Sequence, residues 1–97
     1  MKVKIHEFAD HEFNEAIEWY EMQKEGLGAT FKKSAIHQVK RIQQNPTWFL
    51  KEDDFLFKIY IPKFPYKIVY TIEKNQIVIW AFAHLHRKPF YWRDRVR

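Results

Sequence analysis

The chain has 97 residues, which is the size of one domain with a single modest core, and 46% of its residues are hydrophobic and 30% charged, as in a soluble globular protein. Cysteine is absent, which excludes disulfides and thiolate metal sites and fits a reducing cytoplasm. No apolar run approaches the roughly 18 residues of a membrane span, and the first residues lack the apolar segment of a signal peptide. We therefore expect a cytoplasmic protein with no membrane partner.

The net charge of +5 is concentrated in the second half of the chain. Residues 1–49 carry seven Lys or Arg and seven Asp or Glu, whereas residues 55–97 carry nine basic residues and two acidic ones. Clustering of this kind is typical of a surface that binds a polyanion or an acidic protein. A net charge of this size also serves solubility alone, which is the alternative interpretation.

The first half of the chain predicts a short strand followed by two helices. Apolar and polar side chains alternate over residues 2–8, which is the pattern of a strand. Apolar residues at helical spacing then predict a helix over 10–24 with Asp10 as its N-cap, and a second helix over 29–44 that ends before Pro46. Because the connection between the two helices is short, we expect an antiparallel helical hairpin.

The second half predicts three strands, over 55–61, 66–72 and 77–83, because apolar residues alternate along each segment. Their short connections require antiparallel neighbours. The order β-α-α-β-β-β therefore predicts one α+β domain over residues 1–97, with an N-terminal helical hairpin packed on one face of a mainly antiparallel sheet. We expect basic side chains to gather on the other face, as an open concave surface, and at the C-terminal tail.

Several motifs follow one another in a characteristic order. They are Glu15-Ala16-Ile17-Glu18-Trp19-Tyr20-Glu21, Gly26-Leu27-Gly28 with Phe31, Asn45-Pro46, Phe64-Pro65-Tyr66-Lys67-Ile68-Val69-Tyr70, and the segment from Ala83 to Trp92. In this order the chain resembles the RelE/ParE superfamily of type II toxin–antitoxin toxins, also called plasmid stabilisation proteins. The resemblance spans nearly the whole chain and implies the same β-α-α-β-β-β fold. It also implies a cognate antitoxin, which folds on binding and neutralises the basic surface.

The superfamily has two activities on one fold, so the fold alone does not identify the function. RelE-like members are metal-independent endoribonucleases that cut mRNA, usually on the ribosome, and the resemblance to them implies Lys58, Lys67 and Tyr91 as catalytic residues. ParE-like members inhibit DNA gyrase and need no catalytic residues. The ribonuclease set is incomplete as written, because Lys67 and Leu85 stand where these enzymes have arginine. We hold mRNA cleavage and gyrase inhibition as alternatives, beside a degenerate member that binds only antitoxin or nucleic acid.

The segment from His84 to Arg95 holds most of the candidate site residues, since it combines two imidazoles, four cationic side chains and three aromatic rings. His84 is a candidate acid or base, or else a hydrogen-bonded structural histidine. Arg87 is a candidate phosphate ligand, or else forms an ion pair with an acid on the first helix. The candidate catalytic residues are Lys58, Lys67, His84, Arg87 and Tyr91. The residues expected to bind nucleic acid or a protein partner are Lys63, His86, Lys88, Arg93 and Arg95.

Aromatic residues have a structural interpretation as well. Tyr91 and Trp92 are alternatively anchors that pin the tail to the sheet, and Trp19 and Tyr20 are expected to pack in the core or between the helices. The remaining histidines are scattered without the spacing of a metal site, so we expect no metal and no cofactor.

Overall fold

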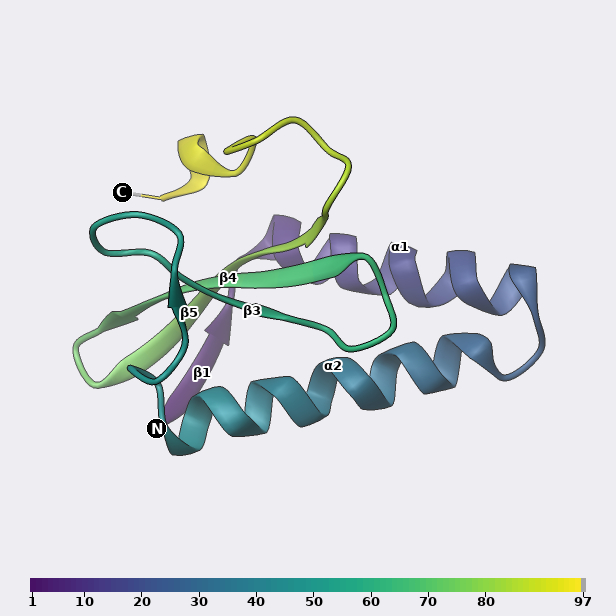
Figure 1. Cartoon of the computed structure of the whole chain (residues 1–97), viewed down its shortest axis with the longest axis horizontal. Helices are drawn as coiled ribbons and strands as arrows, with labels where there is room; N and C mark the ends of the chain where they lie inside the picture. Colours follow the sequence, from purple (N-terminus) through teal and green to yellow (C-terminus); the bar gives the residue numbers. More distant parts are fainter. Residues whose placement is uncertain (97) are drawn as a thin grey trace.

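The computed structural model describes residues 1–96 and contains two helices and one five-stranded sheet (Figure 1). The elements are β1 (Lys2–Ile5), α1 (Glu7–Gln23), α2 (Leu27–Gln44), β2 (Leu50–Lys51), β3 (Phe57–Tyr60), β4 (Tyr66–Glu73), β5 (Gln76–His84) and the 3-10 turn η1 (Arg93–Arg95). The strands lie in the order β1-β5-β4-β3-β2, with β1 parallel to β5 and every other pair antiparallel. The predicted α+β arrangement is confirmed.

The first helix begins three residues earlier than predicted, because its N-cap is His6 and not Asp10. The Nδ1 atom of His6 accepts a hydrogen bond from the N–H of Phe8 at 3.2 Å. Histidine is not one of the residues that usually cap helices, so its position in the sequence does not predict this N-cap. As a result β1 ends at Ile5, and the strand predicted over 2–8 is three residues too long.

The helical hairpin is held together at Gly28, where α2 meets α1. A Cβ atom at this position would lie 2.5 Å from the carbonyl oxygen of Ile17 and 2.9 Å from the Cβ of Glu21. The carboxylate of Glu21 accepts hydrogen bonds from the N–H groups of Gly26 and Gly28, at 2.9 and 3.0 Å. These bonds satisfy N–H groups at the start of α2, a place that also favours negative charge.

The strand predicted over 55–61 is shorter in the structure, and a further strand precedes it. Residues Leu50–Lys51 form β2, which pairs with β3 at the edge of the sheet. Between them, Oδ1 of Asp53 accepts hydrogen bonds from the N–H groups of Phe55 and Leu56 and turns the chain. A two-residue strand has no periodicity to detect, which is why the sequence did not predict it.

Apolar side chains pack on both faces of the sheet. The helix face forms the larger cluster, which contains Ala9, Ala16, Phe31, Ala35, Ile42, Ile59, Ile61, Ile68, Tyr70, Ile77, Ile79 and Phe82. The opposite face forms a second cluster, which contains Leu56, Val69, Val78, Trp80, Ala81, Ala83 and Trp92. Trp92 belongs to residues 85–96, called the tail here, and Figure 1 shows the tail crossing the sheet on the side away from α2. The face that was predicted to be open is therefore partly covered.

Candidate functional site

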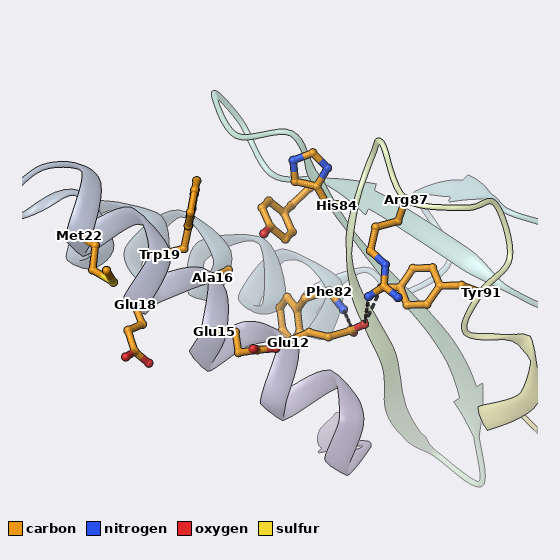
Figure 2. Close-up of a pocket in the computed structure, with 11 residues that line it drawn as sticks. Glu12, Glu15, Ala16, Glu18, Trp19, Met22, Phe82, His84, Arg87 and Tyr91 are labelled. Atoms are coloured by element: carbon orange, nitrogen blue, oxygen red, sulfur yellow. Dashed lines mark hydrogen bonds and ion pairs between the residues drawn. The ribbon is translucent and has the colours of Figure 1, made fainter.

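A groove of about 430 Å³, called the α1 groove here, lies between α1, the end of β5 and the tail (Figure 2). Its lining residues are Glu12, Glu15, Ala16, Glu18, Trp19 and Met22 from α1, Tyr66, Phe82 and His84 from the sheet, and Arg87 and Tyr91 from the tail. The α1 groove thus brings together three of the predicted catalytic residues, His84, Arg87 and Tyr91. The other two, Lys58 and Lys67, do not line it.

Glu12 holds the tail against α1 and forms the polar wall of the α1 groove (Figure 2). Its side chain is 11% exposed. Its Oε1 atom accepts hydrogen bonds from the N–H of Phe82 at 3.1 Å and from Arg95 at 3.0 Å. Its Oε2 atom accepts from the hydroxyl of Tyr91 at 2.6 Å and from Arg95 at 3.0 Å. Sequence reasoning missed Glu12, because these partners are 70 to 83 residues away along the chain.

Arg87 lies between Glu12 and Tyr91. Its Nη1 atom is 3.6 Å from Oε2 of Glu12, so the expected ion pair with an acid on the first helix is confirmed. Its guanidinium also stacks over the ring of Tyr91, 3.8 Å from the centroid. Burial and then the hydrogen bond to Glu12 raise the pKa of Tyr91 well above its usual range. The phenol therefore stays protonated near neutral pH and cannot act as a base.

His84 is half-buried at the end of β5, on the rim of the α1 groove. Its Nδ1 atom accepts a hydrogen bond from the N–H of His86 at 3.1 Å, and its ring packs edge-on against Tyr66. Burial and then the neighbouring His86 lower the pKa of His84 below its ordinary value. A neutral ring that accepts at Nδ1 carries its proton on Nε2, so it offers a hydrogen-bond donor at that atom.

The two candidate lysines lie together on the covered face of the sheet, where both contact Glu52. The Nζ atom of Lys67 is 2.8 Å from Oε1 of Glu52, and that of Lys58 is 3.5 Å from the same oxygen. Glu52 is only 7% exposed, and the Nζ atom of Lys67 lies 4.8 Å from the ring centroid of Trp92. Glu52 therefore compensates part of the positive charge that these two ammonium groups would offer to a phosphate. Sequence reasoning missed Glu52 because it belongs to a short acidic stretch with no repeat pattern.

The residues predicted to bind nucleic acid or a partner differ in their contacts. Arg95 is engaged with Glu12, and Arg93 lies 3.3 Å from Asp53. Lys63 is in the β3–β4 turn, where its backbone has a φ of 69°. His86 and Lys88 are exposed in the tail and form no ion pair within residues 1–96.

The expectation for Trp19 is wrong, whereas that for Tyr20 is confirmed. Trp19 is 58% exposed and Met22 is 78% exposed, and both lie on the rim of the α1 groove (Figure 2). The ring of Tyr20 packs against Phe31 and Phe64 in the core. Tyr20 continues the apolar stripe of Phe13, Ala16 and Ile17 at helical spacing, whereas the helix turns Trp19 about 100° away from Tyr20 and off that stripe.

Residues 1–96 contain neither a metal-binding cluster nor a helix that could span a membrane. No cluster of three or more His, Asp or Glu side chains is arranged to hold a metal ion in this part of the chain. Neither α1 nor α2 combines the length and the apolar character that crossing a membrane requires.

Comparison with known proteins identifies the fold. No protein-family model matches the chain, and no curated protein is significantly similar to it in sequence. A solved structure described as "Chromosomal ParDE TA system from P. aeruginosa" contains a chain that superposes on this one with a TM-score of 0.75, over 89% of this chain and 97% of that chain. The two are 15% identical, so the similarity establishes a shared fold. That fold is the RelE/ParE-like fold that the order of sequence motifs implied.

Proposed function

We propose that the chain is the toxin of a type II toxin–antitoxin module, and that it stops growth in the cytoplasm by binding a protein target, with DNA gyrase the target that the ParE resemblance implies. A cognate antitoxin would neutralise it. The observation that carries this choice is that Lys58 and Lys67 both contact the nearly buried Glu52.

Metal-free cleavage of RNA needs a base for the 2′-hydroxyl, cations for the phosphate and an acid for the leaving oxygen. The two lysines are compensated by Glu52, and an exposed leucine occupies position 85. The hydroxyl of Tyr91 donates to Glu12 and has a raised pKa. Of the residues that the ribonuclease resemblance implies, Lys58 and Lys67 are thus paired with Glu52, and the hydroxyl of Tyr91 is engaged with Glu12.

The α1 groove has the composition of a protein-binding surface. Trp19 and Met22 are exposed along the same groove that Arg87 lines, and aromatic, methionine and arginine side chains are enriched where proteins bind one another. The similarity of the whole fold to a chain of a ParDE system supports the same interpretation. A binder of this kind needs no catalytic group, which agrees with the paired state of the lysines.

Cleavage of mRNA is a second candidate function, favoured by the presence of His84 and Arg87 in one groove. Arg87 is largely exposed, so a phosphate can approach it, and His84 can donate a hydrogen bond from Nε2. The two candidates predict different damage in the cell and can be separated in one experiment.

The test is to induce the chain in bacteria, with and without the protein encoded beside it. We expect growth to stop with the chain alone and to recover on co-expression, and we expect gyrase-dependent DNA breaks with intact mRNA. Mapped mRNA cleavage with intact DNA would assign the ribonuclease activity instead. Unchanged growth with soluble, folded chain would contradict the toxin proposal as a whole.

A further inference from the structure

The two helices of the hairpin carry opposite charge. Helix α1 contains six acidic residues and no Lys or Arg, whereas α2 contains four basic residues and no Asp or Glu. Together with Lys2, Lys4, Lys24 and Glu25, which lie outside the two helices, the charges balance at seven of each sign over residues 1–49, so that half of the sequence looks neutral. In the structure the charges belong to separate helices.

Three lysines of α2 have no acidic partner within residues 1–96, in contrast to several basic residues of the sheet and tail. The basic side chains that form ion pairs with Glu12, Glu52 or Asp53 are Lys58, Lys67, Arg87, Arg93 and Arg95. Lys32, Lys33 and Lys40 are exposed and form no ion pair in the part of the chain that the structure describes. These three unpaired lysines belong to one helix, which lies on the other side of the sheet from the tail (Figure 1).

These lysines border a second groove, of about 610 Å³, called the α2 groove here. Its lining residues are Ala29, Thr30, Lys32, Lys33, Ser34, Ile36, His37, Lys40 and Pro62. Ile36 is 38% exposed although it is apolar, and it lies between Lys33 and Lys40 on the outward stripe of the helix. The α2 groove shares no residue with the α1 groove.

We propose that the α2 groove is a docking surface for an acidic amphipathic helix of a partner protein. Carboxylates of such a helix would pair with Lys33 and Lys40, while its apolar side chains would cover Ile36 and Pro62. The distance along α2 from Ala29 to Lys40 is about 16 Å, which matches three turns of a partner helix.

The residues that line the α2 groove favour the binding of a protein over the binding of a nucleic acid. No aromatic side chain lines the α2 groove, so unpaired bases have nothing to stack on. Arg41, the one arginine of α2, is not part of the lining: it donates to Gln38 and stacks on the ring of Phe49. The remaining cations are lysines, which act as point charges and do not grip phosphate in the bidentate way of arginine. This inference does not depend on the proposed function, since it concerns a different surface.

The test measures binding of a synthetic helical peptide, with leucines along one stripe and glutamates on both sides of it, to the full chain. The variant Lys33→Glu/Lys40→Glu is compared with Lys4→Glu/Lys74→Glu, which makes the same change of charge on β1 and in the β4–β5 turn. We expect the affinity to fall about tenfold or more in the α2 variant and to change little in the control. Amide NMR shifts are expected to concentrate in residues 29–40.

Three results would overturn the proposal. They are no measurable binding of the peptide to the unchanged chain, an equal loss of affinity in both variants, and equal binding of a scrambled peptide of the same composition. A single-stranded RNA that shifts the same amides more strongly than the peptide would assign the α2 groove to nucleic acid. Because all four lysines are exposed, circular dichroism should show folded protein for each variant.

Discussion

Arg95 in η1 donates one hydrogen bond to each carboxylate oxygen of Glu12 in α1, both at 3.0 Å. The pair is nearly buried and joins the end of the described chain to its first helix. We expect Glu12→Gln to lower the free energy of unfolding by about 3 kcal/mol, because it leaves Arg95 desolvated without its counter-ion. Urea denaturation measures the loss. Glu15→Gln, which changes an exposed carboxylate on the same helix, should alter the free energy of unfolding by less than about 0.5 kcal/mol. Similar losses for the two variants would contradict a structural role for the pair of Glu12 and Arg95.

Trp92 contributes to stability through its ring and not through its indole N–H. The residue is 2% exposed, and its Nε1 atom has no hydrogen-bond partner within residues 1–96. We expect Trp92→Ala to destabilise the fold by about 3–5 kcal/mol, as the loss of a large buried side chain does. Trp92→Phe should cost about 1.5 kcal/mol or less, because it also removes an unsatisfied donor. Thermal denaturation of the two variants measures both losses of stability. A phenylalanine variant as unstable as the alanine variant would contradict the inference that the ring, and not the N–H, stabilises the fold.

Gly28 is required by the close approach of the two helices. A methyl group there would meet the backbone oxygen of Ile17, which cannot move aside as a flexible side chain can. We expect Gly28→Ala to reduce stability by about 1–3 kcal/mol, despite the higher helix propensity of alanine. The comparison is Ala29→Gly, an exposed change on the next residue, which should cost about 1 kcal/mol through propensity alone. Propensity alone would make Gly28→Ala more stable than the unchanged chain, so a Gly28→Ala variant of equal or higher stability would contradict the importance of this contact.

His84 should make the fold less stable in acid. Its folded-state pKa is lowered by burial and by His86, whereas in the unfolded chain it should return to its ordinary value of 6.5. The unfolded state therefore binds more protons, so stability is complete above that value and is lost as the pH falls through the lower folded pKa. Comparing urea midpoints near about pH 7.5 and about pH 5.5 should show a smaller acid loss for His84→Gln than for the unchanged chain. An identical loss in both would exclude His84 as a source of this dependence.

A substitution of Lys58 distinguishes the two candidate activities, binding of a protein target and cleavage of mRNA. Glu52 keeps its closer partner, Lys67, when Lys58 is changed, so Lys58→Met should fold normally. If the chain acts by binding a protein, growth inhibition should persist in this variant and should weaken in Arg87→Ala, which alters the α1 groove. If Lys58 were catalytic, its removal would instead lower the cleavage rate about a hundredfold or more. Loss of toxicity in Lys58→Met at equal expression would therefore support the ribonuclease.

Most of the fold was predictable because its longer elements have clear periodicity. The alternating residues of β4 and β5 and the apolar stripe of α2 fix both the element types and their buried faces. The elements that were missed or misplaced are local exceptions: a two-residue strand at Leu50, and a helix capped by His6. Neither leaves a repeating pattern in the sequence.

The candidate site was predictable only where its residues are close together in the chain. His84, Arg87 and Tyr91 were found because they occur within eight consecutive positions. Glu12 and Glu52, which decide how free the cations are, come from other parts of the chain and meet them only in the folded state. Counting charges along the sequence therefore does not show which cations are paired: Lys67 and Arg95 have acidic partners, whereas Lys33 forms no ion pair within residues 1–96.

The contacts of Glu12 also determine when a newly synthesised chain can finish folding. Its partners follow it by 70 to 83 residues, and β1 completes the sheet only when β5 is present. Contacts of such long sequence separation form late. A chain still being translated would have its first helix without the carboxylate's partners and its first strand without a neighbour. The protein would thus acquire its finished surfaces only after nearly all of its residues have left the ribosome.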